Sequence, residues 1–247
     1  MNPRPTLLVI GATSDIARAV AHAFAAGGHD LILTARDPRQ LERDAADLHH
    51  RHGASVTCLA LDLLADDTTL ANFAAGLNPL PTVVFCAVGL LGDPPRSLDD
   101  PDTTRQVMMS NFVGPAQMLT LLARRYRDSG SGTLIGVSSV AGDRGRGSNF
   151  AYGSAKAGFS AFLSGLRNHL HPHGVRVMTV KPGFVSTRMT AGLSLPPALT
   201  ATPTQAAQDI YRAFLRQRDE VYTLWMWRWI MLIIRLLPES LFKRLRL

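Results

Sequence analysis

Residues 6–17 read Thr6-Leu7-Leu8-Val9-Ile10-Gly11-Ala12-Thr13-Ser14-Asp15-Ile16-Ala17. The first five residues are apolar or β-branched, which predicts a short buried strand. After a turn, the stretch from Ile16 to Ala26 predicts a helix that ends at Gly27-Gly28. A helix that begins directly after a strand offers backbone N–H groups and a positive dipole end to a phosphate group. Of the usual glycines only Gly11 is present, and Asp15 has the alternative role of a helix cap.

The same strand-like pattern recurs along the chain and predicts the fold class. Apolar runs occur at residues 30–35, 55–60, 82–88, 132–137 and 175–180, and longer helix-like stretches separate them. Alternation of this kind is typical of βαβ units, whose right-handed crossovers build a doubly wound parallel sheet of the Rossmann type. A length of 247 residues suits one α/β domain. We expect a catalytic domain over residues 1–224 and a basic amphipathic helical extension over residues 225–247.

Tyr152 and Lys156 stand four residues apart, and Ser139 lies thirteen residues upstream, at the end of an apolar run. On one helix, a spacing of four places both side chains on the same face. An ammonium group beside a phenol stabilises phenolate and lowers the phenol pKa, so Tyr152 could give and take a proton. The Ser139 hydroxyl could polarise a substrate oxygen. This set predicts carbonyl–alcohol redox chemistry, whereas an isolated Tyr-x-x-x-Lys would more simply be a surface helix.

The order of the motifs resembles the short-chain dehydrogenase/reductase family, from Thr6 to about Met189. The remaining family-like segments are Asp62 after the third strand, Ala87-Val88-Gly89 after the fourth, Asn111 in a helix, and Pro182-Gly183 with Thr187. Their occurrence in this order is far more specific than any one motif. The resemblance implies an NAD(P)-dependent oxidoreductase.

The same resemblance implies roles for individual residues. Asn111, Ser139, Tyr152 and Lys156 match the catalytic tetrad, in which the Asn holds a water that links the Lys to solvent. The residues that would bind the dinucleotide are Gly11, Thr13, Ser14, Asp15, Ile16, Arg36, Asp62, Leu63, Ala87, Val88, Gly89, Tyr152, Lys156, Pro182, Gly183, Val185 and Thr187. One departure is Cys86-Ala87, which stands where the family usually has two asparagines.

Arg36 follows the second strand run and bears on the choice of cofactor. An acidic residue at this place would bind the ribose 2′-hydroxyl of NAD and repel a 2′-phosphate. Arginine instead pairs with phosphate through two N–H groups, so NADP(H) is favoured over NAD(H). The alternative is an Arg that stacks on the adenine.

The C-terminal segment carries much of the formal net charge of +7. Between Trp225 and Leu247 there are five basic residues against one acidic residue, interleaved with three tryptophans and an aliphatic run; the basic residues are Arg228, Arg235, Lys243, Arg244 and Arg246. The apolar part is too short, and too interrupted by arginine, to span a bilayer. It predicts peripheral contact with an anionic membrane through residues 225–247; the alternatives are a dimer interface or a flap over the substrate cleft. The basic residues follow an apolar ribbon rather than a groove-reading motif, so we expect no nucleic-acid partner.

A narrower resemblance points to a substrate class. The loop after the fourth strand, the segment Ser148–Ser154, Arg188-Met189 and the closing segment from Leu237 to Leu245 are similar to the reductases of decaprenylphosphoryl-2-keto-erythro-pentose. This implies reduction of a lipid-linked 2-keto-pentose to the arabinose-configured alcohol in cell-envelope biosynthesis, with a flavin oxidase partner that makes the ketone. Arg144 and Arg146 could bind the phosphodiester of such a substrate. The alternatives are a reductase of another hydrophobic ketone, such as a 3-oxoacyl compound, and a non-catalytic nucleotide-binding scaffold.

The remaining composition bears on compartment and assembly. Both cysteines, Cys58 and Cys86, fall in predicted strands, which indicates buried free thiols and a reducing cytoplasm. The N-terminus shows no secretory signal, so we expect a cytoplasmic enzyme, peripheral at the inner face of the cytoplasmic membrane. Two histidine groups at helix ends lack the usual companions of a metal site, and no metal is expected. The family resemblance implies a homodimer through helices at roughly 104–129 and 150–170.

Overall fold

The structure, a computed structural model, describes residues 4–93 and 96–245. These residues form a seven-stranded parallel sheet in the order β3-β2-β1-β4-β5-β6-β9, which is the doubly wound arrangement expected from the sequence. Its strands are β1 (Thr6–Ile10), β2 (Asp30–Ala35), β3 (Val56–Ala60), β4 (Val83–Cys86), β5 (Gly132–Val137), β6 (Val175–Pro182) and β9 (Glu220–Thr223). A second, two-stranded sheet pairs β7 (Phe184–Val185) with β8 (Thr200–Ala201).

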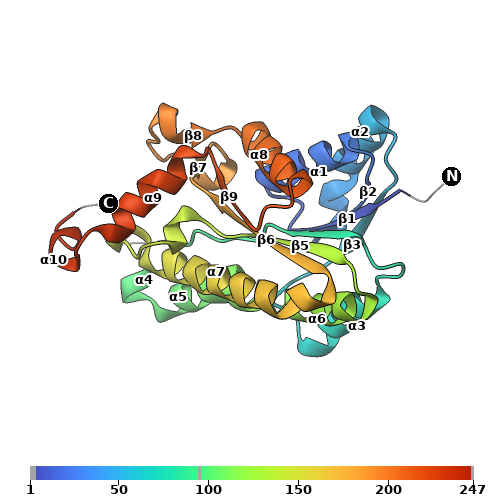
Figure 1. Ribbon diagram of the computed structural model, residues 1–247, viewed down its shortest axis with the longest axis horizontal. Coiled ribbons are helices and arrows are strands. Elements are labelled where there is room, and N and C mark those ends of the chain that lie inside the picture. Colours follow the sequence, from blue (N-terminus) through green and yellow to red (C-terminus); the bar gives the residue numbers. More distant parts are fainter. Residues whose placement is uncertain (1–3, 94–95, 246–247) are drawn as a thin grey trace.

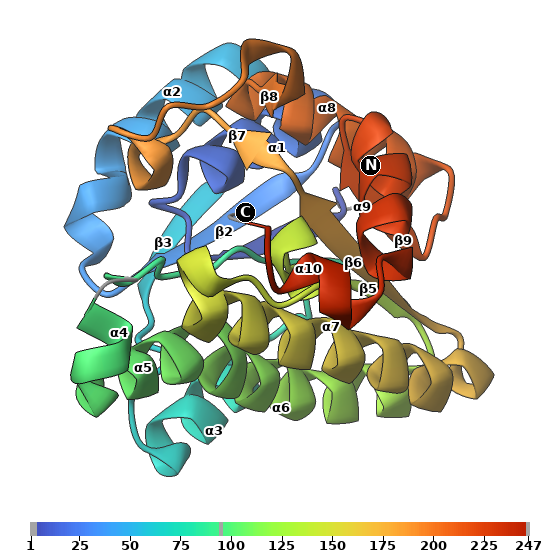
Figure 2. The same cartoon turned by 90° about the vertical axis from the view of Figure 1, so that its left-hand side faces the viewer.

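Helices cover both faces of the main sheet (Figure 1). One layer consists of α1 (Asp15–Ala26), α2 (Glu42–His52) and α8 (Pro203–Leu215). The other consists of α3 (Asp67–Gly76), α4 (Arg96–Asp99), α5 (Pro101–Met108), α6 (Gly114–Ser129) and α7 (Phe150–Leu170). Figure 2 shows the two layers with the sheet between them.

Alternation along the strands divides the core into two halves. On β1, Leu7 and Val9 pack into the cluster under α1 and α8, whereas Leu8 and Ile10 pack into the cluster under α3, α6 and α7. Successive side chains of a strand point to opposite faces, so a strand covered on both sides must be apolar throughout. This explains why the strand runs are continuously hydrophobic in the sequence.

The seventh strand of the main sheet, β9, was not predicted, because strands were expected only at the six apolar runs of the sequence. β9 lies at the sheet edge and pairs with β6 in parallel, with Val180 opposite Val221 and Lys181 opposite Tyr222. It is four residues long and only half-buried, so it lacks the apolar run that marks the other strands. Its position continues the sheet directly into the C-terminal segment.

Two long helices were expected near the catalytic residues. α7 occupies Phe150–Leu170, as predicted. The predicted helix at 104–129 is instead built from α5, a π-helical turn at Met109–Val113 and α6. The extra residue of a π turn rotates the side chains that follow it, and such turns are frequent at functional sites.

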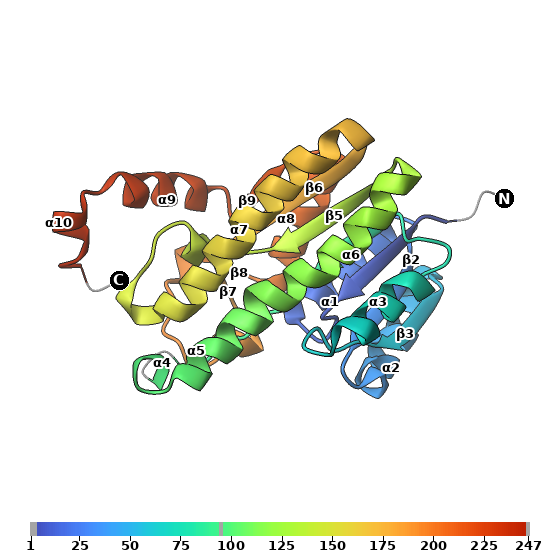
Figure 3. The same cartoon turned by 90° about the horizontal axis from the view of Figure 1, so that it is seen from below.

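The C-terminal segment projects from one end of the molecule as α9 (Met226–Leu236) and α10 (Glu239–Phe242) (Figures 1 and 3). Arg246, counted among the basic residues of the segment, lies outside the described residues. Within the described part of the chain, no helix has both the length and the apolarity needed to cross a bilayer.

Candidate active site

One cavity of about 490 Å³ brings together residues from the carboxyl ends of the strands. Every residue expected to bind a dinucleotide lines it, from Gly11 in the first turn to Thr187 after β7. Ser139, Tyr152 and Lys156 line the same cavity, so the cofactor and catalytic sets predicted from separate motifs meet in one place. Parallel strands end at the same edge of a sheet, which is why segments far apart in the sequence converge here.

The turn between β1 and α1 has the backbone shape that a phosphate needs. Gly11 has φ +83°, and a Cβ at this position would lie 2.8 Å from Cγ2 of Val88, so both conformation and space require glycine. Ser14 is the N-cap of α1, and its side chain makes no capping hydrogen bond. The first N–H groups of α1 therefore remain available to an anion at the cavity wall.

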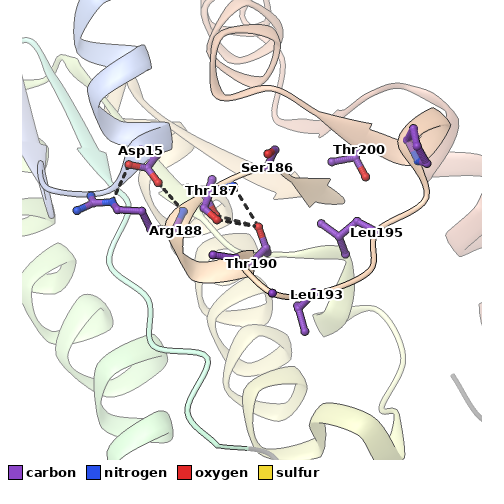
Figure 4. Close-up of a pocket in the computed structure, with 11 residues that line it drawn as sticks. Asp15, Ser186, Thr187, Arg188, Thr190, Leu193, Leu195 and Thr200 are labelled. Atoms are coloured by element: carbon purple, nitrogen blue, oxygen red, sulfur yellow. Dashed lines mark hydrogen bonds and ion pairs between the residues drawn. The ribbon is translucent and has the colours of Figure 1, made fainter.

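Asp15 neither caps α1 nor stays free. Its carboxylate accepts hydrogen bonds from the backbone N–H of Arg188 at 2.7 Å and from the Arg188 Nε at 3.0 Å. The Arg188 guanidinium also donates to the carbonyl of Thr13. Figure 4 shows this clamp at the mouth of an adjoining cavity of about 570 Å³, lined on its far side by Leu193 and Leu195. The loop after β7 is thus tied to the first turn, a contact across 173 residues that no local pattern indicates.

Lys156 lies beneath Tyr152 and is 2% exposed. Its Nζ donates to the carbonyls of Val137 at 3.0 Å and Val88 at 3.3 Å, and lies 5.8 Å from the centre of the Tyr152 ring. Burial disfavours the charged form and lowers the pKa of Lys156 to about 8. The ammonium group is therefore held close to the Tyr152 ring, as the spacing predicts, and it loses its proton as the pH rises through about 8.

The pKa of Tyr152 departs from the expectation. Burial raises it above its ordinary value, while the hydroxyl of Ser139 and the guanidinium of Arg146 act in the opposite direction. The prediction that the Lys156 ammonium lowers this pKa is wrong: burial raises the pKa, and the groups that oppose the rise are Ser139 and Arg146, not Lys156. A phenol that keeps its proton at neutral pH is suited to donating it.

Ser139 is fixed by the turn that follows β5. Its Oγ accepts a hydrogen bond from the N–H of Ala141 at 3.1 Å and so caps a short 3-10 helix, Val140–Gly142. The neighbouring Ser138 hydroxyl lies 2.8 Å from the Lys156 carbonyl, where it ties β5 to α7. These contacts hold the Ser139 hydroxyl and the Tyr152 phenol on the same side of the cavity.

Asn111 sits inside the π-helical turn and is fully buried. Its side-chain amide donates to the carbonyls of Leu90 at 2.7 Å and Val107 at 2.8 Å, and its Oδ1 accepts from the Leu90 N–H at 3.1 Å. A Cβ on Gly89 would lie 3.2 Å from this Oδ1 and 3.7 Å from the Lys156 Nζ, so Asn111 and Lys156 both approach the space next to Gly89. Asn111 does not line the cavity wall, and it approaches Lys156 from behind that wall.

The residues at the end of β2 favour a phosphate. Arg36 is exposed at the cavity, and within the described residues its guanidinium makes no hydrogen bond or ion pair. The adjacent Asp37 is turned away: its carboxylate accepts from the backbone of Arg39 at 3.1 Å and pairs with the Arg39 guanidinium at 2.9 Å. The Arg36 guanidinium is therefore available to a phosphate, whereas the Asp37 carboxylate is already paired with Arg39.

The segment with the unusual Cys86-Ala87 pair keeps the expected course. The N–H of Ala87 donates to the carbonyl of Ile10 at 2.9 Å, so this backbone continues the strand pairing between β4 and β1. Burial raises the pKa of the Cys86 thiol to about 11, which makes it an unreactive apolar group. The substitution of the usual asparagines therefore leaves the backbone of the cavity wall in place.

The structure separates the two arginines that the sequence assigns to the substrate. Arg144 is committed to the C-terminal segment: its guanidinium pairs with the Glu239 carboxylate at 2.6 Å and lies 4.4 Å from the centre of the Phe242 ring. Arg146 is partly buried, and its Nε has no hydrogen-bond partner among the described groups. Its charge acts on Tyr152 by lowering the pKa of that phenol, but Arg146 is not among the residues that line the cavity.

Comparison with known proteins agrees with this geometry. The family model described as short chain dehydrogenase matches residues 5–197. The chain belongs to the short-chain dehydrogenase family. An uncharacterised oxidoreductase of Mycobacterium tuberculosis is 36% identical over 242 residues, which cover 97% of this chain and 96% of the relative. An uncharacterised oxidoreductase of Streptomyces coelicolor is 37% identical over 249 residues, covering 98% and 96% of the two chains.

The fold of the family is also found in solved structures. A short-chain dehydrogenase from Sphingobium yanoikuyae in complex with NADPH superimposes with a TM-score of 0.82 at 23% identity, and the match covers 96% of this chain and 97% of that chain. This match shows that the two chains share the α/β fold, and membership of the short-chain dehydrogenase family makes the present chain an NAD(P)-dependent oxidoreductase.

Proposed function

We propose that this short-chain dehydrogenase is an NADP(H)-dependent reductase of a large lipid-linked ketone, with a polyprenyl-phosphoryl 2-keto-pentose as substrate. The observation that carries the reductase proposal is the meeting of Ser139, Tyr152 and Lys156 in the cavity lined by the dinucleotide-binding residues. A protein that only senses a nucleotide has no need of a proton donor at that place. This favours an enzyme over a scaffold.

The cavity residues fit a dinucleotide. The crowded backbone at Gly11 and the uncapped start of α1 suit a pyrophosphate, and Asp62 with Leu63, which line the same cavity, would hold the adenine. Pro182, Gly183, Val185 and Thr187 would hold the nicotinamide end. When bound, the reduced cofactor supplies the hydride for the carbonyl carbon.

The protein's own residues supply the proton. Reduction of a ketone places negative charge on its oxygen, and the Tyr152 O–H donates a proton to that oxygen while the Ser139 hydroxyl donates a hydrogen bond to it. The Lys156 ammonium, 5.8 Å from the centre of the ring, is the nearby positive charge that would balance the phenolate left behind. Tyr152 would regain its proton through Lys156 and a water held by Asn111, as the family resemblance implies; the closeness of both residues to the Cβ position of Gly89 supports this.

Preference for NADP(H) over NAD(H) follows from the end of β2. The free, exposed Arg36 can pair with a 2′-phosphate, and Asp37 is held by Arg39, so it offers no free carboxylate to the ribose. The NADPH complex of the Sphingobium relative is consistent with this choice.

Support for a phosphate-bearing substrate comes from Arg146. A partly buried guanidinium whose charge acts on the proton donor, and whose Nε has no hydrogen-bond partner among the described residues, would suit an anionic group of the substrate. We further propose that a flavin oxidase makes the ketone that this enzyme reduces. The enzyme would work at the inner face of the cytoplasmic membrane and form a homodimer through α5, α6 and α7. The alternative substrate is another hydrophobic ketone, such as a 3-oxoacyl compound.

The test compares two ketones, a short-chain polyprenyl-phosphoryl 2-keto-pentose and a neutral ketone of similar size. We expect Arg146→Ala to raise KM about tenfold for the phosphate-bearing ketone only, because one charge-assisted hydrogen bond is lost. Any change in kcat caused by the altered Tyr152 pKa should be shared by both ketones. Arg144→Ala serves as the matched control and should leave KM nearly unchanged.

Equal changes in KM for both ketones would show that Arg146 does not bind a phosphate of the substrate, and would favour a neutral hydrophobic substrate. NADPH binding without turnover of either ketone, or of a wider ketone panel, would favour the scaffold.

A further inference from the structure

α9 has apolar side chains on two opposite faces. The inner face buries Trp227 and Met231, which pack with Val140, Phe184 and Leu199. The outer face exposes large side chains at a helical spacing, and these are Trp225 (72% exposed), Trp229 (56%), Leu232 (45%), Ile233 (64%) and Leu236 (75%). A surface helix of a soluble domain normally turns polar residues outward, so this outer face needs a partner.

Basic side chains border the outer face. Arg228 and Arg235 are exposed, and a spacing of seven residues places them on the same side of α9. At the start of the helix, Trp225 and Arg228 form one wall of a groove of about 520 Å³. Three more arginines line this groove, namely Arg212, Arg216 and Arg218.

The acidic residues of the groove are already paired. Glu220 lies 2.8 Å from the Lys181 ammonium. Asp209 accepts a hydrogen bond from the N–H of Leu224 at 3.0 Å and lies 3.9 Å from Arg212. Positive charge is therefore left over along one edge of the apolar face.

We propose that the outer face of α9 and this arginine groove form a docking surface for an anionic lipid bilayer. Tryptophans at the start of an amphipathic helix suit the headgroup level, and the aliphatic side chains that follow suit the acyl boundary. The flanking arginines would bind lipid phosphates. Exposed Leu241 on α10, and Leu245 just after it, continue the same pattern beside Lys243 and Arg244.

Charge argues for a bilayer rather than a second copy of the chain. In a two-fold symmetric dimer, the same patch faces itself. Pairing this surface with itself would bring arginines against arginines, and the nearby carboxylates are engaged elsewhere. An anionic surface has the complementary charge at every position.

The docking surface is connected to the active site through the inner face of α9. The Trp227 indole packs on Gly183, where a Cβ would lie only 1.9 Å from Nε1, and this Nε1 donates to the Leu199 carbonyl at 3.1 Å. Gly183 lines the cofactor cavity, and the Arg144–Glu239 pair ties α10 to the loop between Ser139 and Tyr152. If the proposed function holds, a docked bilayer presents its lipid-linked substrate beside Tyr152.

The test is co-sedimentation of the full-length protein with vesicles of phosphatidylcholine, with or without phosphatidylglycerol. We expect binding only to the anionic vesicles and at least about tenfold weaker binding for Arg228→Gln combined with Arg235→Gln. Trp229→Glu combined with Ile233→Glu should abolish binding. Leu98→Glu, a change of an equally exposed residue on α4, is the matched control and should bind as the wild type does.

Two outcomes would overturn the docking surface. One is the absence of binding to anionic vesicles. The other is a wild-type dimer in sedimentation velocity that Trp229→Glu with Ile233→Glu converts to a monomer, which would assign the face to a second copy. Vesicle binding needs no turnover, so failure of this proposal and failure of the reductase proposal are distinguishable.

Discussion

Lys156 is the residue whose surroundings most directly set the chemistry. It is an ammonium group with almost no exposure, and its hydrogen bonds go to two backbone carbonyls rather than to a carboxylate. Such a group loses its proton far more easily than a lysine in water. The charge that assists Tyr152 is therefore present only over part of the accessible pH range.

A dependence on pH follows. The pKa of Lys156 is lowered by burial from 10.5 to about 8, so the ammonium is present below that pH and lost above it. Tyr152 also has to carry its proton to act as a donor. We expect kcat/KM for ketone reduction to be level at lower pH and to fall as pH rises through about 8. A pH–rate profile measures this, and a rise in rate through the same range would contradict it.

Cofactor choice is decided at Arg36. Replacement by Asp removes the partner of the 2′-phosphate and adds a repelling charge, so the ratio of kcat/KM for NADPH to that for NADH should fall about 10- to 100-fold. Steady-state rates with both cofactors measure it. Arg43→Asp, an equal change of charge on an exposed residue of α2 outside the cavity, is the control. If the ratio of kcat/KM for NADPH to that for NADH were unchanged in Arg36→Asp, another residue would have to bind the 2′-phosphate.

The residues of the site were predicted from the sequence more completely than their contacts and pKa values. The Tyr152, Lys156 and Ser139 set was predicted from spacing and chemistry, and the rest of the cavity lining from the family resemblance. The Arg188 clamp on Asp15 was not predicted, because it joins residues 173 apart through the fold. The direction of the Tyr152 pKa was also wrong, since burial is not visible in a motif.

At the scale of elements, the edge strand β9 anchors the loop that carries the catalytic serine. Lys181 on β6 reaches the Asp143 carboxylate at 2.9 Å and the Glu220 carboxylate at 2.8 Å, and the Tyr222 hydroxyl donates to Asp143 at 2.8 Å. Burial alone would lower the pKa of Lys181, but the hydrogen bonds to Glu220 and Asp143 outweigh it and raise this pKa. The loop after β5 is thus held by an ion pair that is almost fully buried.

Breaking this pair has a predictable cost. Lys181→Met leaves the Asp143 carboxylate, which is 4% exposed, with the Tyr222 hydroxyl as its one side-chain partner among the described residues. We expect a loss of about 3–5 kcal/mol in the free energy of unfolding, measured by urea denaturation. Adding Asp143→Asn removes the uncompensated charge and should restore most of it. Equal stability of the single and double variants would show that the buried charge is not the cause.

Elements differ in how far the sequence predicts them. The five inner strands were predicted because a strand that is buried on both faces is apolar throughout, and β3, a half-buried edge strand, still has an apolar run. The helix α7 was also predicted. β9 was missed because a short, half-exposed edge strand has no such signal. The π-helical turn was missed because one additional residue in a helix changes no pattern, although it positions Asn111.

At the level of the whole molecule, we infer that the sheet brings a dinucleotide site and a proton donor together in one reductase. The measurement that tests it most directly is NADPH oxidation by the wild type and by Tyr152→Phe, using the ketone that the wild type reduces fastest. NADPH binding is followed in parallel by fluorescence. We expect kcat to fall about 100- to 10,000-fold in the variant while NADPH affinity stays within about twofold. Turnover at the wild-type rate by Tyr152→Phe would show that Tyr152 is not the proton donor.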